Sequence, residues 1–185
     1  MEVPLILSGL WLMLPALLPN SAAVLFGGGR PVDMGRSLGG RRILGDGKTW
    51  MGLAGGWAAG VSLGIVQLMI ALPFDPAGFW GFGPFPGNLL LVATLSLGSL
   101  MGDMGGSFLK RRLDLPRGAR FPVLDQYDFL IGAFALALLH GDWFYRSFLE
   151  GDSLLALAVL LVAVPLLHRA VNIVGYKMGK KDVPW

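Results

Sequence analysis

The chain has 185 residues, of which 54% are hydrophobic and only 15% charged, with a formal net charge of +3 and no cysteine. Soluble proteins carry about a quarter charged residues, so this composition excludes a soluble globular domain and indicates an integral membrane protein. The absence of cysteine excludes disulfides, thiolate catalysis and cysteine metal sites. The length suits one unit, and we expect a single membrane domain over residues 1–185.

Apolar runs of the roughly 20 residues that a bilayer crossing needs occur repeatedly along the chain. The first run has no basic residue before it and is too long for a signal-peptide core, so we expect it to be retained. The fourth run is the least clean, because it contains Asp128 and His140. The sequence predicts an all-α integral membrane protein, a bundle of five transmembrane helices over residues 3–26, 50–73, 88–108, 127–148 and 154–174.

Basic residues concentrate in two glycine-containing loops, 27–49 and 109–126, which together hold ten of the fifteen Lys and Arg residues. Four more follow from Arg169 to the C-terminus, whereas the other two loops are acidic or nearly uncharged. By the positive-inside rule, the two basic loops and the C-terminus face the cytoplasm and the N-terminus faces out. We therefore expect a multi-pass protein of the cell membrane with its chemistry on the cytoplasmic side.

Asp103 is predicted near the cytoplasmic end of the third span, where a carboxylate is costly unless it pairs, faces a cavity or binds a cation. Asp103, Ser107, Lys110 and Arg111 share one helical face by their spacing. A salt bridge from Asp103 to Lys110 or Arg111 is the structural alternative. The neighbouring pair of glycines leaves room for a ligand and favours a functional role.

Asp125 and Asp128 lie three residues apart at the start of the fourth span and project to the same side. Asp125 has an alternative role as a helix N-cap, whereas Asp128 lies inside the first turn and needs a partner. Together with Asp103 these carboxylates predict a metal site, and Mg²⁺ suits oxygen ligands that leave room for phosphates. The two histidines, His140 and His168, are expected to be structural.

The loop 27–49 combines glycines with five cations and the acids Asp33 and Asp46. Glycines allow backbone amides to approach phosphate oxygens, and Arg and Lys neutralise them. Residues 47–49 look like the end of a P-loop, but the full pattern fails and no strand precedes it. The loop predicts an anion site at the start of the second span, with topogenic charge and anionic-lipid contact as the alternative. Asn20 and Ser21, late in the first span, either bond between helices or line a polar cavity.

These residues suit phosphoryl or nucleotidyl transfer, in which the substrate brings its own nucleophile and catalysis consists of positioning and charge neutralisation. The sequence also resembles the archaeal CDP-archaeol synthase family over nearly its whole length. The similar stretches are RPVD from residue 30, GGRRILGDGKT from residue 39, GD at 102, SFLKRR from 107 and PVLDQYDF from 122. The last two stretches are also similar to the phosphatidate cytidylyltransferase signature.

The resemblance implies transfer of CMP from CTP to an isoprenoid glycerol phosphate lipid, an unsaturated archaetidic acid, giving CDP-archaeol and pyrophosphate. It implies that the catalytic residues are Asp103, Asp128 and Lys110, and that Asp103, Asp125 and Asp128 hold Mg²⁺. The residues it implies for the nucleotide and phosphates are Arg30, Asp33, Arg41, Asp46, Lys48, Ser107, Arg111 and Arg112.

Two other classes of protein are weighed against this interpretation. A CDP-alcohol phosphatidyltransferase needs a dense aspartate array within one helix pair, whereas here a basic loop separates Asp103 from Asp125 and Asp128. A non-enzymatic transport or anionic-lipid protein would favour inverted repeats and charges near the bilayer midplane. No nucleic-acid partner is expected, and the sequence leaves a homo-oligomer open.

Overall fold

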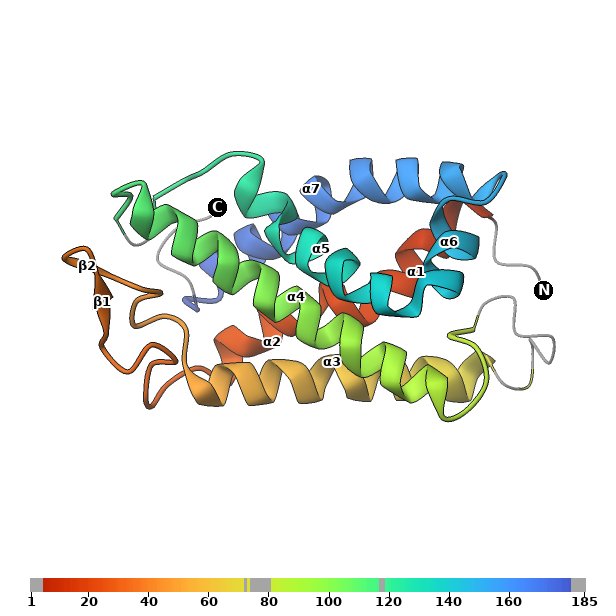
Figure 1. The fold of residues 1–185 in the computed structure, drawn as a ribbon, viewed down its shortest axis with the longest axis horizontal. Helices are drawn as coiled ribbons and strands as arrows, with labels where there is room; N and C mark the ends of the chain where they lie inside the picture. Colours follow the sequence, from red (N-terminus) through yellow and green to blue (C-terminus); the bar gives the residue numbers. More distant parts are fainter. Residues whose placement is uncertain (1–4, 72, 74–80, 117–118, 181–185) are drawn as a thin grey trace.

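The computed structural model describes residues 5–71, 73, 81–116 and 119–180 as a bundle of helices (Figure 1). Its elements are α1 (Leu5–Leu17), α2 (Pro19–Leu25), β1 (Ser37–Leu38), β2 (Arg41–Arg42), α3 (Trp50–Ala71), α4 (Gly87–Arg112), α5 (Leu124–Ala137), a 3₁₀ turn (Leu138–His140), α6 (Gly141–Phe148) and α7 (Ser153–Lys177). The described strands are two residues long and lie in the loop between α2 and α3. The prediction of an all-α membrane body is therefore confirmed.

Four helical stretches are long and apolar enough to cross a membrane among the residues described, and these are Leu7–Leu25, Trp50–Ala71, Gly87–Arg112 and Ser153–Lys177. The fourth predicted span, 127–148, is wrong as one continuous helix, because α5 ends at Ala137 and α6 begins at Gly141 after a 3₁₀ turn. The polar side chains of His140, Asp142 and Arg146 oppose a continuous apolar helix there. The third predicted span, 88–108, corresponds to α4, which extends to Arg112, past the predicted end. Residues 3, 4 and 72 of the predicted spans lie outside the described residues.

Two prolines shape the first helical stretch, and each removes the hydrogen bond of the carbonyl four residues earlier. Pro15 frees the carbonyl of Trp11, which accepts a hydrogen bond of 2.7 Å from the Gln67 side chain. Pro19 frees the carbonyl of Pro15, which accepts one of 2.9 Å from Ser96. Both donors are almost fully buried. Since lipid offers no alternative partner, these side chains explain why the prolines are tolerated and how α1 is tied to α3 and α4.

The proline in α7 is accommodated in the same way. Pro165 frees the carbonyl of Leu161, and the Tyr127 hydroxyl of α5 donates a hydrogen bond of 2.7 Å to it. This bond fixes the start of α5 against α7. It therefore helps to place Asp128, which follows Tyr127 by one residue.

Glycine stripes allow the helix backbones to approach closely. In α3, Gly52, Gly56, Gly60 and Gly64 are buried against α1, α2 and α4. A Cβ at Gly56 would lie 2.6 Å from the Pro19 carbonyl oxygen, and one at Gly60 would lie 2.6 Å from the Pro15 carbonyl oxygen. The opposite face of α3 exposes large apolar side chains, among them Met51, Ile65, Val66 and Met69. A helix with small residues on its packed face and large apolar residues on its exposed face fits a lipid environment.

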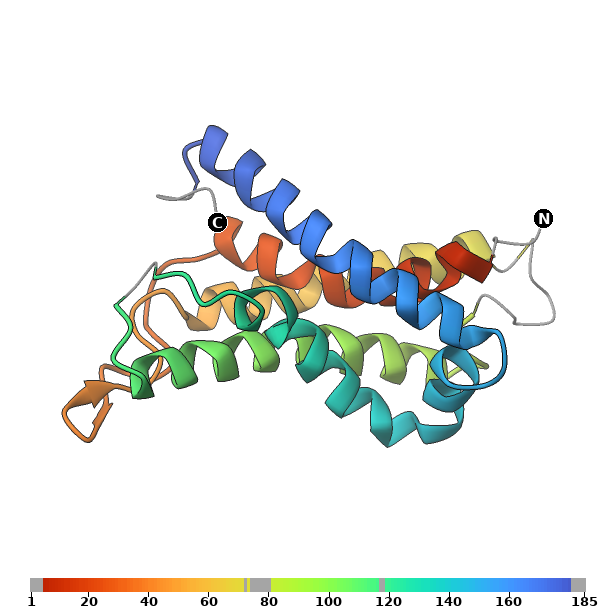
Figure 2. The same ribbon diagram turned by 90° about the horizontal axis from the view of Figure 1, so that it is seen from above.

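The helices run up and down along the bundle, as two views show (Figures 1 and 2). The loop after α2, the loop after α4 and the end of α7 lie at the same end. The 3₁₀ turn and α6 lie at the opposite end, together with the start of α7. The two loops that carry most of the basic residues are thus neighbours in space.

Candidate functional site

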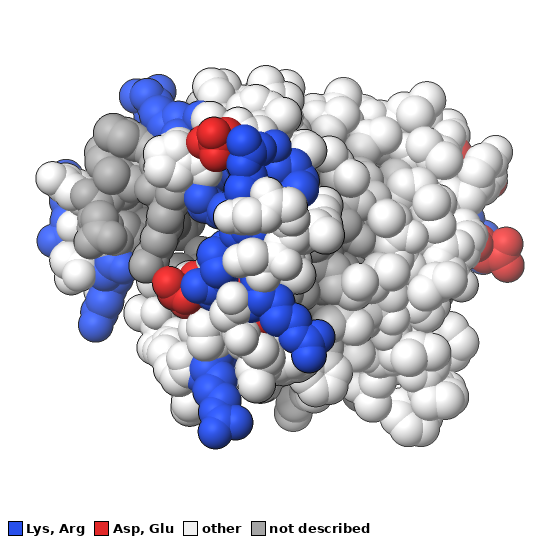
Figure 3. All heavy atoms as spheres, turned by 60° about the vertical axis from the view of Figure 1, so that its left-hand side comes forward, with Lys and Arg blue, Asp and Glu red and all other residues white. Residues whose placement is uncertain are grey.

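Lysine and arginine side chains gather over the end of the bundle formed by the loops after α2 and α4 (Figure 3). We call this the basic end. The remaining surface in this view is largely uncharged, with acidic residues at its far edge. An end of this kind attracts polyanions and sits beside, rather than within, the hydrocarbon layer.

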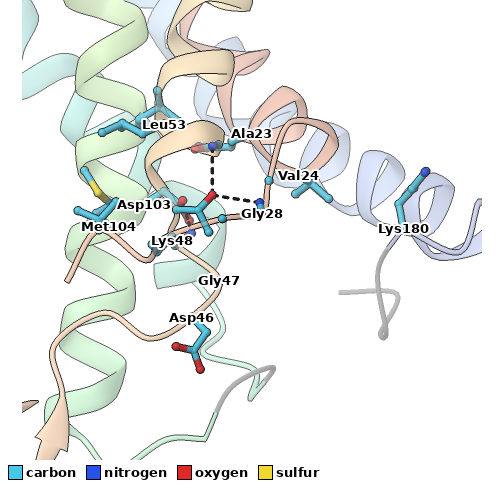
Figure 4. Close-up of a pocket in the computed structure, with 17 residues that line it drawn as sticks. Ala23, Val24, Gly28, Asp46, Gly47, Lys48, Leu53, Asp103, Met104 and Lys180 are labelled. Atoms are coloured by element: carbon cyan, nitrogen blue, oxygen red, sulfur yellow. Dashed lines mark hydrogen bonds and ion pairs between the residues drawn. The ribbon is translucent and has the colours of Figure 1, made fainter. Parts of the chain in front are cut away.

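One cavity at this end, the loop cavity, has a volume of about 720 Å³ and lies between the loop 27–49 and the first turn of α3 (Figure 4). Thr49 caps α3, because its hydroxyl accepts hydrogen bonds from the amides of Gly52 (3.1 Å) and Gly28 (3.3 Å). This cap holds the glycines against the helix start. Backbone amides and a helix N-terminus around one cavity make a suitable environment for phosphate. The residues that line it include Asn20, Gly27, Gly28, Gly29, Asp46, Gly47, Lys48, Thr49, Asp103 and Lys180.

A second cavity of about 580 Å³, the basic cavity, lies between the two loops. Most of its polar lining is cationic. The lining includes Arg41, Arg42, Asp46, Lys48, Ser107, Lys110, Arg111 and Asp114. Ser107, Lys110 and Arg111 thus lie together as their helical spacing predicted, whereas Asp103 lines the other two cavities.

The third cavity, of about 440 Å³, is mainly apolar and is lined mostly by residues of α1, α2, α5 and α7, with single residues of α3 and α4. We call it the apolar cavity. Its polar lining residues include Asn20, Ser21, Lys48, Asp103, Asp125, Asp128, His168 and Asn172. The three carboxylates that the sequence singled out therefore face one cavity, although they come from two helices.

Lys48 is the residue at which the three cavities meet, because it lines each of them. Its ammonium group forms an ion pair with Asp103, and the two side chains point toward one another (Figure 4). Both side chains are about one quarter exposed, at 26% and 28%. The sequence alternative, a salt bridge from Asp103 to Lys110 or Arg111, is not the pair that the structure contains. Lys110 instead pairs with Asp125.

Asp128 is buried at the contact between α4 and α5. One carboxylate oxygen accepts a hydrogen bond of 2.6 Å from the amide of Phe129, and the other lies where a side chain at Gly106 would project. Because position 106 is a glycine, there is space for this carboxylate. Asp125 is held differently, since it also accepts a hydrogen bond of 2.9 Å from the amide of Phe121.

The carboxylates fit Mg²⁺ only in part. Within the described ranges, no group of three or more acidic, histidine or cysteine side chains is placed to hold a metal ion. Mg²⁺, however, is commonly bound by one or two carboxylates together with substrate phosphates and water. Asp103 and Asp128 supply such oxygens beside the cavities, so the donor set suits a metal that arrives with phosphates.

Asp33 lies within the loop 27–49 as its internal anchor. Its carboxylate is fully buried and accepts bonds from the Arg42 side chain (2.8 and 3.3 Å) and from the amides of Gly35 (3.1 Å), Leu44 (3.0 Å) and Gly45 (2.9 Å). The Arg42 guanidinium and these amides hold the pKa of Asp33 well below its usual range. A carboxylate saturated in this way shapes the loop and has no free oxygen for a nucleotide.

Asp33→Asn is expected to loosen this loop, because an amide nitrogen would face donors that need an acceptor. Exchange of the Leu44 and Gly45 amides, measured by hydrogen–deuterium exchange, should become roughly tenfold faster or more. Since the folded pKa is lowered, wild-type loop protection should be constant above about pH 4 and should fall as pH drops below it. Unchanged exchange in the variant would contradict this role.

The remaining arginines of the prediction occupy different positions. Arg30 is exposed at the start of the loop. Arg41 pairs with Asp114 at 3.1 Å and donates to the carbonyl of Arg112 at 2.8 Å. Arg112 donates back to the loop and lines none of the three cavities. Asp46 pairs with Arg42 at 2.8 Å and lines the loop and basic cavities.

Sequence reasoning missed two side chains of α7. His168 and Asn172 line the apolar cavity, contact one another at 3.3 Å and lie near the carboxylates, and His168 stacks on Phe129. Their spacing of four residues in an apolar helix was the available signal. Asn20 was left between two roles and has both, since it donates to Ser99 at 3.3 Å and lines two cavities.

Comparison with known proteins identifies the family. A family model described as "CarS-like: CDP-archaeol synthase" matches residues 2–185. The chain belongs to the CDP-archaeol synthase family. CDP-archaeol synthases from Halobacterium salinarum (46% identical, covering 95% of this chain and 94% of the relative) and Methanospirillum hungatei (48%, covering 94% and 100%) are among its relatives.

A solved structure supports the same assignment. The structure of an intramembrane enzyme for archaeal membrane lipids biosynthesis matches with a TM-score of 0.70 and 40% identity, covering 91% of this chain and 94% of that one. The resemblance found in the sequence motifs is thus confirmed. As a CDP-archaeol synthase the protein is a CTP-dependent cytidylyltransferase of archaeal membrane lipid biosynthesis.

Proposed function

We propose that CMP transfer takes place where the three cavities meet, at Lys48 and Asp103, within a single membrane domain. The observation that carries this proposal is that Lys48 lines all three cavities while it pairs with Asp103. One of these cavities is glycine-lined, one is cationic and one is apolar. A nucleotide and a lipid phosphate therefore have neighbouring sites that share one cation.

CTP is placed in the loop and basic cavities. The amides around Thr49 and the α3 N-terminus suit phosphate oxygens, and the cations of the basic cavity suit the negative charge of a triphosphate. The residues proposed for these contacts are Arg30, Arg41, Asp46, Lys48, Ser107, Lys110 and Arg111. Asp33 is proposed to act from within the loop.

The lipid substrate, an archaetidic acid with isoprenoid chains, is placed in the apolar cavity. Leucine and valine side chains of α1, α2 and α7 form much of its wall, and the carboxylates and Lys48 also line it. This arrangement leaves the phosphate of the lipid beside the nucleotide cavities. Its chains would extend between helices toward the surrounding lipid.

Mg²⁺ is proposed to be held by Asp103 and Asp128, with Asp125 in the same cavity. When bound, the ion supplies charge neutralisation for the phosphates and withdraws electrons from the phosphorus. The pair of Asp103 with Lys48 keeps a cation and an anion at the meeting point before substrates arrive.

In the proposed reaction, a phosphate oxygen of the lipid attacks the α-phosphorus of CTP. A new phosphoanhydride bond forms, the bond between the α- and β-phosphates breaks, and pyrophosphate leaves. The nucleophile is already an anion, so no side chain needs to remove a proton from it. Lys48, Lys110 and Arg111 orient the phosphates and neutralise charge. On the positive-inside rule, this site is proposed to face the cytoplasm.

A reconstituted assay tests the proposal. Pyrophosphate release by the purified protein with Mg²⁺ should require both CTP and archaetidic acid, and a CDP-lipid should not replace CTP. Lys48→Met should raise the KM values of both substrates, each by about tenfold, because the residue serves both sites. Lys177→Met removes the same charge from the exposed end of α7 and should have no effect. A change in only one KM would contradict the shared position.

A further inference from the structure

We propose that Arg112 is a positioning residue, which holds the loop 27–49 in the conformation that binds CTP by donating hydrogen bonds to backbone carbonyls of the loop, an arrangement called the grip below. This assignment differs from the phosphate contact that its sequence motif implies. It rests on the proposed function, because that proposal gives the loop to CTP. The adjacent residues Arg111 and Arg112 then have different roles, one in binding phosphate and one in shaping the loop.

Among the described residues, the contacts recorded for the Arg112 guanidinium are with the neighbouring loop and with its own helix. One terminal nitrogen donates to the carbonyl of Leu38 in β1. The other donates to the carbonyls of Arg41 (3.1 Å) and Arg42 (2.8 Å) in β2. The single side chain therefore spans both strands of the hairpin and fixes their separation.

Two further contacts lock this arrangement. The Arg41 side chain donates a hydrogen bond of 2.8 Å to the carbonyl of Arg112, so each of these two side chains donates to the backbone carbonyl of the other residue. The Arg112 guanidinium also lies over the ring of Phe108, at 5.3 Å from its centre. The terminal nitrogens of this guanidinium are bonded to carbonyls and its face lies over a ring, and Arg112 lines none of the three cavities.

Arg111 carries the same charge but projects elsewhere. The Nε atoms of both arginines are buried without an acceptor among the described residues, and Arg111 donates to the carbonyl of Leu115. Arg111 lines the basic cavity, whereas Arg112 does not, and this difference separates the two residues. Arg111 lies beside Gly45, at 3.9 Å from the position that a Cβ there would take. Arg111 is thus the arginine that can bind a phosphate in the basic cavity, whereas Arg112 stabilises the shape of the loop 27–49.

The two roles make opposite demands on a lysine substitution. A phosphate contact needs positive charge, which lysine keeps in large part. A grip on three carbonyls needs the planar fork of arginine, which a single ammonium group cannot reproduce. Substituting lysine and glutamine at each position therefore separates charge from geometry.

The experiment compares Arg112→Lys, Arg112→Gln, Arg111→Lys and Arg111→Gln in the full-length protein. Both Arg112 variants should raise the KM for CTP by a similar factor, roughly tenfold, and leave the KM for the lipid unchanged. At Arg111 the lysine variant should be clearly better than the glutamine variant. Arg146→Gln, at the opposite end of the bundle, controls for the loss of one charge.

Hydrogen–deuterium exchange of residues 36–43 without nucleotide provides the second measurement. It should be faster in both Arg112 variants while α5 and α7 exchange as in the wild type. Unchanged exchange in Arg112→Gln would overturn the proposal, and so would an Arg112→Lys enzyme with wild-type KM for CTP when Arg112→Gln raises that KM. Faster exchange with an unchanged KM for CTP would support the grip and instead contradict the assignment of this loop to the nucleotide.

Discussion

Asp128→Asn and Asp103→Asn are each expected to lower kcat by about 100-fold or more. The substitution keeps the size of the side chain and removes the negative charge that would attract a divalent cation. Asp128 is buried between α4 and α5, and Asp103 lies at the meeting point of the loop and apolar cavities. The measurement is pyrophosphate release at saturating CTP and lipid.

Magnesium titration distinguishes a metal ligand from a residue that only supports the fold. Either variant should need more Mg²⁺ for half-maximal activity, and chelation of Mg²⁺ should abolish the wild-type activity. Asp142→Asn, in α6 at the opposite end, removes a carboxylate without approaching the cavities and should behave as wild type. An Asp128→Asn enzyme with normal kcat and normal Mg²⁺ dependence would exclude Asp128 from the metal site.

The sequence predicted the membrane body well because bilayer crossing depends mainly on the length and composition of apolar runs. It placed the helix breaks less well. Pro15 and Pro19 are visible in the sequence, but their effect depends on whether Gln67 and Ser96 reach the freed carbonyls. The break at 138–140 likewise depends on what surrounds a few polar side chains.

The candidate site was predictable as a set of residue types but not as a set of partners. Lys48 and Asp103 are 55 residues apart, and nothing in the sequence pairs them in preference to Asp103 with Lys110. Arg111 and Arg112 are adjacent and identical in type, so only the positions of the β1 and β2 carbonyls separate their roles. Asp33 was assigned to the nucleotide and phosphates with the rest of its loop, and its bonds within the loop could be known only from the folded structure.

Gly106→Ala is expected to reduce activity by roughly 10- to 100-fold while changing the unfolding temperature little. A Cβ at this position would collide with a carboxylate oxygen of Asp128, which is the movable end of a side chain, and would lie 3.0 Å from the Asp128 Cβ, where a small shift suffices. The protein can relieve the collision by turning that carboxylate aside, so the fold survives and the proposed metal site does not. The measurements are pyrophosphate release and thermal unfolding in detergent.

Two neighbouring glycines of α4 provide matched controls. A Cβ at Gly105 would meet nothing within 4 Å, so Gly105→Ala should leave both activity and stability near wild type. A Cβ at Gly102 would collide with the backbone carbonyl of Asp128, which cannot turn aside, so Gly102→Ala should separate α4 from α5 and destabilise the protein. If Gly106→Ala and Gly102→Ala lose stability alike, position 106 serves helix packing. If Gly106→Ala alone loses activity at normal stability, glycine is needed at position 106 because a side chain there would displace the Asp128 carboxylate.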